Sequence, residues 1–151
     1  MRTLDEIDLA GSLDRAFDVA SGVERWPAFL PHYRWVRMLE PRNGTSVVEM
    51  AAWRPFGFVK YPTWWVSEME VVPAAYQIRY THIRGITAGM DVVWQLSQRQ
   101  DHVHISIVHE WTGPQWPVIG GIAANLVIGP VFIHGIARRT LEGVKRELEH
   151  A

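Results

Sequence analysis

The chain has 151 residues, a formal net charge of −1 and no cysteine. A chain of this length is typical of one domain that buries roughly two-thirds of its unfolded surface, so we expect a single domain over residues 1–151. The nearly balanced charge gives no reason to expect a nucleic-acid partner or an anionic membrane. The absence of cysteine excludes disulfides and thiolate metal sites. Together with an N-terminus that lacks the apolar core of a signal peptide, it favours a cytoplasmic protein.

The first part of the chain predicts a strand followed by two short helices. Residues 2–10 alternate imperfectly between an apolar set and a polar set, which predicts a strand. The two sets are Leu4, Ile7 and Leu9 against Asp5, Glu6 and Asp8. Ser12 is a suitable N-cap for a helix that buries Leu13, Ala16, Phe17 and Ala20. A second short helical segment covers residues 23–31 and ends at a proline.

The middle of the chain predicts about six antiparallel strands, at residues 33–40, 45–53, 58–72, 76–84, 89–99 and 102–111. Residues 41–44 and 54–57 carry the Pro, Asn and Gly signals of turns. Period-two alternation then assigns the inward side chains of the last four strands. These are Trp65, Ser67, Met69 and Val71; Tyr76, Ile78, Tyr80 and His82; Met90, Val92, Trp94 and Leu96; and Val103, Ile105, Ile107, His109 and Trp111.

The last stretch, residues 131–149, predicts a long amphipathic helix that begins just after Pro130. Its apolar face is made by Ile133, Ala137, Leu141, Val144 and Leu148. Such a helix is only marginally stable alone, so the face needs a partner. The strands upstream predict that this partner is one curved antiparallel sheet. The expected class is therefore α+β.

The segment before this helix is unusually apolar. No Asp, Glu, Lys or Arg occurs between Trp111 and Ala137. The length could cross a bilayer, but glycines, Pro130 and His134 interrupt it and no basic cluster precedes it. We favour a short apolar helix or lid at residues 118–128, able to contact ligand, a membrane surface or a second copy.

Four motifs in this order resemble the START/Bet v 1-like helix-grip superfamily, in its polyketide cyclase/dehydrase and lipid-transport branch. They are Val23-x-x-Trp26-Pro27-x-x-Leu30-Pro31-x-Tyr33, Trp65-Val66-Ser67, Gly89-Met90-x-Val92-x-Trp94, and Arg139-Thr140-Leu141-x-x-Val144-Lys145. The resemblance covers essentially the whole chain. It implies about seven strands wrapped around the C-terminal helix, with a deep apolar cavity between them.

The resemblance also implies a function with two alternatives. The chain is similar to aromatase/cyclases, whose pocket holds a poly-β-ketone for aldol closure and dehydration, without metal. An inward arginine of those enzymes falls at Met69 here, and an asparagine falls at His134. A methionine cannot hydrogen-bond an enolate, so the second alternative is a carrier or sensor of a lipid or isoprenoid quinone. Both imply a hydrophobic small-molecule ligand and no cofactor.

Several residues are candidates for binding and proton transfer in such a cavity. Those for proton transfer are Tyr33, Ser67, His82, His109 and His134. Those for ligand contact are Trp26, Tyr33, Met50, Trp65, Ser67, Met69, Tyr80, Met90, Trp94, Trp111 and His134. The eight tryptophans exceed what a core of this size needs, which favours a lined cavity. Inward indoles and imidazoles also occur as plain core, and that alternative stays open. His102 and His104 share the outer face without an evident third ligand, so we expect no metal site there.

Overall fold

The computed structural model describes the chain except for residues 43–44, 57–58, 86, 113–129 and 150–151. The expected turn at residues 41–44 and the expected lid at 118–128 therefore fall wholly or partly outside the described residues. Among the residues that are described, no helix combines the length and apolarity needed to span a bilayer.

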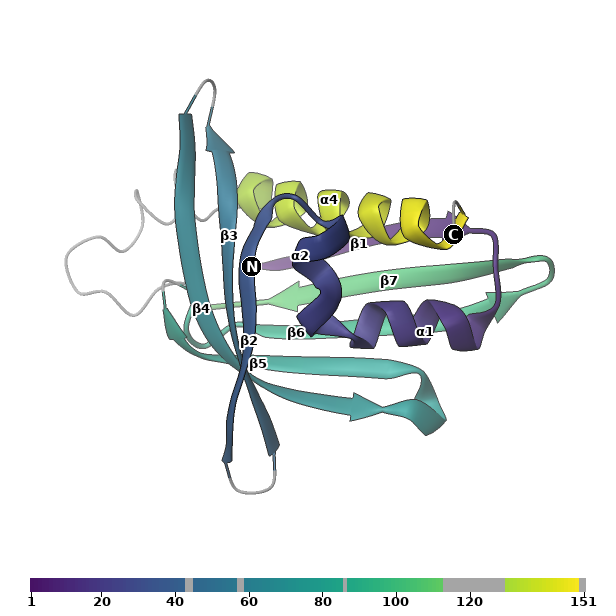
Figure 1. The fold of residues 1–151 in the computed structure, drawn as a ribbon, viewed down its shortest axis with the longest axis horizontal. Coiled ribbons are helices and arrows are strands. Elements are labelled where there is room, and N and C mark those ends of the chain that lie inside the picture. The colour runs from purple at the N-terminus through teal and green to yellow at the C-terminus, as the bar shows by residue number, and fades with distance from the viewer. Residues whose placement is uncertain (43–44, 57–58, 86, 113–129, 150–151) are drawn as a thin grey trace.

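The element order begins with a strand and short helices, continues through the sheet, and ends in a long helix (Figure 1). The first elements are β1 (Arg2–Leu9), α1 (Leu13–Ser21), the 3₁₀ turn η1 (Val23–Arg25) and α2 (Trp26–Phe29). The sheet continues with β2 (Tyr33–Arg42), β3 (Thr45–Phe56), β4 (Val59–Val72), the 3₁₀ turn η2 (Pro73–Ala75), β5 (Gln77–Gly85), β6 (Asp91–Arg99) and β7 (His102–Glu110). The last element is α4 (Pro130–Glu149).

The seven strands form one antiparallel sheet in the order β1-β7-β6-β5-β4-β3-β2. The chain meanders from β2 to β7 through neighbouring strands, and β1 closes the far edge by pairing with β7. Register shifts interrupt the pairing of β2 with β3 and of β4 with β5, the latter between Val66 and Ser67. Such irregularities bend a sheet, and the long strands β2 to β4 curve across the others in Figure 1.

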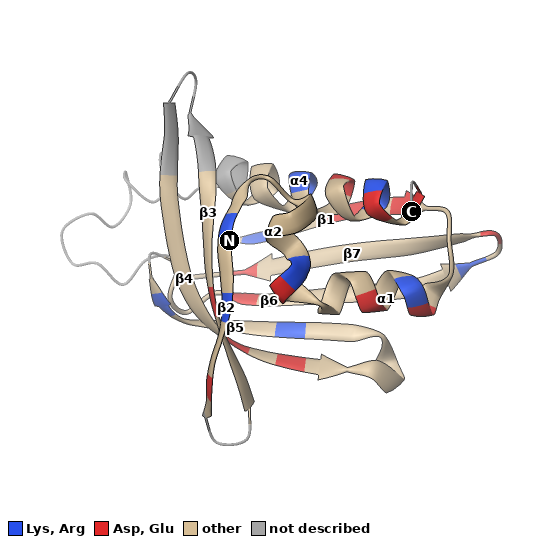
Figure 2. Ribbon diagram, in the orientation of Figure 1, with Lys and Arg blue, Asp and Glu red and all other residues tan. Residues whose placement is uncertain are grey.

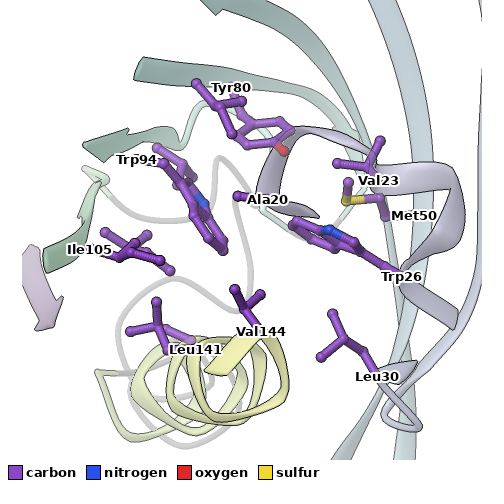
Figure 3. Close-up of a cluster of buried hydrophobic side chains, with 14 of the residues drawn as sticks. Ala20, Val23, Trp26, Leu30, Met50, Tyr80, Trp94, Ile105, Leu141 and Val144 are labelled. Atoms are coloured by element: carbon purple, nitrogen blue, oxygen red, sulfur yellow. The ribbon is translucent and has the colours of Figure 1, made fainter. Parts of the chain in front are cut away.

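Helix α4 lies against the inner side of this curved sheet and packs along β1, α1 and α2. All five residues of the predicted apolar face are buried, with Leu141 and Val144 fully inaccessible. Figure 3 shows Leu141 and Val144 facing the indole of Trp94 and the side chains of α2. The charged residues of α4 lie on its other sides (Figure 2). The predicted helix–sheet architecture is confirmed.

The inward assignments are confirmed for most strand positions and wrong at Val71, which is 41% exposed because it lies near the end of β4. Tyr76 lies in the left-handed turn before β5, and its ring packs edge-on against the buried Phe17. Residues 54–56 continue β3 as a ladder with β4 and do not form a turn.

The alternation of β1 is opposite to the predicted one at its start. Leu4 is 45% exposed, whereas Asp5 is 5% exposed and shares the inward face with Leu9. Side chains alternate between the two faces along a whole strand. The register with β7 and the burial of the apolar Leu9 therefore determine which side chains of β1 face inward. Asp5 is thereby carried into the interior beside α4.

Two glycines of α4 provide a matched test of the packing. Gly143 is buried, and a Cβ there would collide with Cδ2 of Leu30, which is itself fully buried. A Cβ at Gly135 meets no neighbour among the described residues. Alanine is the better helix former at both positions, by about 1 kcal/mol.

We therefore expect Gly135→Ala to raise the free energy of unfolding by about 0.5–1 kcal/mol. Gly143→Ala should lower it by about 1–3 kcal/mol because of overpacking against Leu30. Urea unfolding of both variants checks this. An increase in stability for both would contradict the predicted seating of α4 on α2.

Candidate functional site

A cavity lies between the sheet and α4, and its walls are mostly aromatic and aliphatic. The free volume is about 70 Å³. This is well below the roughly 300 Å³ of the smallest sites for drug-sized ligands. The lining residues are Trp26, Tyr33, Met50, Trp65, Tyr80, His82, Thr87, Met90, Val92, Trp94, Ile107, His109, Ile133, Ile136, Ala137 and Thr140.

Aromatic rings occupy much of the space between helix and sheet. The ring centroids of Trp26 and Trp94 are 5.6 Å apart, and those of Trp26 and Tyr33 are 5.2 Å apart. Tyr33 also meets Trp65 edge-on, at 6.2 Å. The rings therefore contact one another across the interior, as Figure 3 shows for Trp26 and Trp94. A larger ligand could enter only if these indoles change rotamer or move apart.

His82 on β5 forms one polar corner of the cavity. Its ring stacks on Trp65, with centroids 5.7 Å apart and planes 3° from parallel, and Nδ1 lies 2.6 Å from Oγ1 of Thr87. The connection from β5 to β6 holds Thr87 there, because backbone N–H groups of Gly89 and Met90 donate to carbonyls of His82 and Thr87. Burial, then the neighbouring His109, lowers the pKa of His82 to about 3. His82 is therefore neutral at physiological pH.

His109 on β7 and Tyr80 on β5 bring unpaired polar atoms to the same cavity. Nδ1 of His109 and the hydroxyl of Tyr80 are buried and lack a hydrogen-bond partner among the described residues. Burial lowers the pKa of His109 to about 4, with a further contribution from His134, and burial raises the pKa of Tyr80 well above 10. Both groups are neutral hydrogen-bonding sites. Leaving each unpaired costs about 1–3 kcal/mol, so they favour a bound water or ligand.

A second polar corner lies where α4 meets the start of β2. Oγ1 of Thr140 donates to the carbonyl of Ile136 and lies 3.0 Å from Nε2 of His32. Burial raises the pKa of Tyr33. Burial, then the charges of Arg139 and Arg146, lowers the pKa of His32 to about 4.

His134 and Asp5 form a pair beside the cavity. Nδ1 of His134 lies 2.7 Å from Oδ1 of Asp5, whose side chain is only 4% exposed, whereas the His134 side chain is 44% exposed. Oδ2 of Asp5 is buried without a partner among the described residues. The pair joins α4 to β1 and fixes the imidazole orientation.

The structure brings only some of the predicted residues to the cavity wall. Trp26, Tyr33, Met50, Trp65, Tyr80, His82, Met90, Trp94 and His109 line it. Ser67, Met69 and Trp111 are buried in the sheet but do not line it, and His134 lies to one side. The Oγ of Ser67 is buried without a partner among the described residues, whereas the Trp111 indole donates to the carbonyl of Ala88.

Sequence reasoning missed four polar residues at or beside the site: Asp5, His32, Thr87 and Thr140. Thr140 had a detectable signal, since it follows Ile133, Ile136 and Ala137 at helical spacing. Thr87 and His32 lie in connections, where period-two or helical patterns do not apply.

His102 and His104 lie on the outer face as predicted. His104 is bonded through Nδ1 to Asp8 at 2.6 Å and through Nε2 to Glu6 at 3.3 Å. The hydrogen bond with His104 is the main cause that lowers the pKa of Asp8. In the part of the chain that the structure describes, no group of three or more His, Asp or Glu side chains has the arrangement of a metal site.

The sequence matches one known protein family over most of its length. A family model described as polyketide cyclase / dehydrase and lipid transport matches residues 9–130. The chain belongs to this family. A search of curated proteins gave no match.

Solved structures share the fold at low sequence identity. A protein from Thermus thermophilus superposes with a TM-score of 0.81 at 13% identity, covering 99% of this chain and 98% of that one. The Zhui aromatase/cyclase from Streptomyces sp. R1128 gives 0.77 at 17% identity, covering 99% and 94%. A START superfamily protein from Mycobacterium smegmatis gives 0.75 at 13% identity, covering 99% and 97%. These likenesses establish the START/Bet v 1-like helix-grip fold.

The neutral buried histidines make stability depend on pH. His32 and His82 have folded pKa values of about 4 and 3, against about 6.5 when unfolded. Below pH 6.5 the unfolded chain gains protons that the folded chain does not. Each histidine should therefore remove up to about 1.4 kcal/mol of stability per pH unit as the pH falls toward its folded pKa.

Urea unfolding at several pH values between 7 and 5 measures this slope. The free energy of unfolding should fall steadily over that window. His82→Gln should give a shallower slope, whatever its stability at pH 7, because one titrating group is gone. Equal slopes for both proteins would show that His82 titrates normally in the fold.

Proposed function

We propose that this protein binds a neutral, largely apolar small molecule in the cavity between α4 and the sheet. The observation that carries the proposal is the pair of buried polar atoms, the Tyr80 hydroxyl and Nδ1 of His109, which lack a partner among the described residues in an otherwise apolar aromatic wall. A ligand that offers a hydroxyl or carbonyl oxygen to either atom would supply the missing hydrogen bond. Indole and thioether surfaces would cover the rest of it.

The charge state of the wall supports a neutral ligand. His82 and His109 are uncharged at pH 7, and Met50, Met90 and the indoles carry no charge. A carboxylate or phosphate in this wall would lose its hydration without gaining a cation, which is costly. Flat phenolic polyketides and isoprenoid quinones meet the requirement, because both combine an apolar body with neutral oxygen atoms.

Binding without turnover is the function that the geometry supports best. General acid–base catalysis works best when the pKa of the group lies near the working pH. Imidazoles with pKa values of about 3 and 4 are weak bases. At pH 7 they are neutral, so they cannot act as imidazolium general acids. Met69 supplies no charge to an enolate and does not line the cavity. These observations support a carrier or sensor.

A cyclase/dehydratase is the second candidate, favoured by the family and by the likeness to the Zhui aromatase/cyclase. In such a reaction a base removes a proton from a methylene between two carbonyls, and the carbanion attacks a third carbonyl carbon. This attack closes the ring, the alkoxide takes up a proton, and loss of the hydroxyl with an α-hydrogen as water forms the double bond. In this chain His82 or His109 would accept the first proton, and Tyr80 would hydrogen-bond the alkoxide. Either histidine would need its pKa raised by the bound substrate.

A pair of tyrosine variants tests the site. Tyr80→Phe removes an unpaired hydroxyl, so the free energy of unfolding should stay the same or rise. Its affinity for a hydroxylated or quinone ligand should fall about tenfold, since a hydrogen bond of about 1–1.5 kcal/mol is lost. Tyr76→Phe is the matched control, because its hydroxyl donates to Asp14 outside the cavity; it should lower stability by up to about 1 kcal/mol and leave the affinity unchanged.

Tryptophan fluorescence and thermal shift would report binding of flat phenolic polyketides and long-chain quinones. Turnover of a poly-β-ketone into a dehydrated ring would support the cyclase, and binding without turnover would support the carrier. Tyr80→Phe that binds every ligand like the wild type would remove the basis for placing the ligand in this cavity.

A further inference from the structure

The outer face of the sheet carries a second concentration of tryptophan, away from the cavity. Trp35, Trp53 and Trp64 lie on β2, β3 and β4, and the register places them on the face opposite to Trp65 and Met50. Each is only partly buried. We define the outer tryptophan patch as Arg34, Trp35, Arg37, Leu39, Trp53 and Trp64. The cavity therefore accounts for only part of the tryptophan surplus.

Two arginines are held against the indoles of this patch. The guanidinium of Arg34 lies 4.7 Å from the ring centre of Trp35 and 4.6 Å from that of Trp53, and the guanidinium of Arg37 lies 5.1 Å from the ring centre of Trp35. Stacking orders the Arg34 side chain and leaves its N–H edge available. Within the described part of the chain, no carboxylate pairs with Arg34.

Glu49, a carboxylate beside the patch, is already engaged. Oε1 of Glu49 accepts from the Trp35 indole at 3.1 Å and lies 3.7 Å from Arg37, and the Glu49 side chain is only 18% exposed. The accessible charge of the patch is therefore positive. Figure 2 shows basic bands along β2, and an acidic band nearer the lower end of the same strand. An anionic partner is favoured.

An aliphatic side chain extends the patch along the free edge of the sheet. Strand β2 is an edge strand, and Leu39, which shares the outer face with Trp35 and Arg37, is 41% exposed. Pairing with β2 of a second copy is disfavoured. Pro41 on this strand has no N–H to donate to a partner strand.

We propose that the outer tryptophan patch binds the surface of an anionic phospholipid bilayer. Indoles favour the boundary between headgroups and acyl chains, arginine side chains bind phosphate, and Leu39 supplies apolar surface for shallow insertion. The exposed Leu39 side chain favours a lipid over a nucleic acid, which offers it no apolar phase. This inference is independent of the cavity, and it gives the protein a membrane contact outside residues 118–128.

The test is flotation of the full chain with phosphatidylcholine vesicles, with and without phosphatidylglycerol. The wild type should bind the phosphatidylglycerol vesicles, and added salt should weaken that binding. Arg34→Glu should lower the partition coefficient about tenfold or more, since each basic residue near such a surface contributes about 1 kcal/mol. Arg79→Glu is the matched control, because Arg79 is exposed on β5, outside the patch, and hydrogen-bonds the side chain of Gln77. It should bind within about twofold of the wild type.

Circular dichroism melting would establish that both variants fold. Quenching by brominated phosphatidylglycerol should be weaker in Trp35→Phe than in the wild type. Three results would overturn the proposal: no binding to phosphatidylglycerol vesicles, equal losses for Arg34→Glu and Arg79→Glu, or Arg34-dependent binding of single-stranded RNA without vesicle binding.

Discussion

The contact between the apolar face of α4 and the concave side of the sheet holds the other elements in place. Leu141 and Val144 are fully buried in it, and Leu30 packs against the same helix at Gly143. A curved sheet cannot fill its own concave side, so the helix and the large side chains beneath it must do so. The cavity is the remaining space that those side chains do not fill. Its aromatic walls follow from the size of the gap, and its small volume follows from contacts between the rings.

Polar groups in this interior are kept neutral by the same burial. His32, His82 and His109 all lose basicity because burial removes the water that would solvate the charged ring, and neighbouring positive groups add to the effect. Asp5 beside His134 is a different case, since a carboxylate and an imidazole meet where α4 leaves part of the ring exposed. The interior therefore offers hydrogen bonds without charge.

The two faces of β2–β4 divide the tryptophans between different environments. Trp65 faces the cavity and stacks on His82, whereas its neighbour Trp64 faces outward. The inner indoles are packed among apolar rings, and the outer ones carry arginine on their faces. A protein with both an apolar internal cavity and a cationic aromatic surface has the chemistry to receive an apolar molecule at a membrane. The two features are separate in space and can be altered separately.

The sequence alone determined the architecture, because periodicity carries that information directly. The spacing of Ile133, Ala137 and Leu141 predicts the buried face of α4, and alternation predicts the inward side chains of β6 and most of β7. It also placed Trp26, Trp65 and Trp94 together, through a combination of inward parity and family resemblance.

Only the tertiary structure decided the polar details of the site. Asp5 is internal because it alternates in step with Leu9, whose burial sets the inward face of β1. Thr87 and His32 lie in connections between elements, where the sequence has no periodic signal. Ser67 and Met69 face inward but do not line the cavity. Alternation predicts the face of the sheet on which a side chain lies, but it does not predict whether another side chain separates it from the cavity. Pairing between distant residues, such as Asp5 with His134, depends on how helix and strand cross. That crossing is set by the packing of whole elements and leaves no local signal in the sequence.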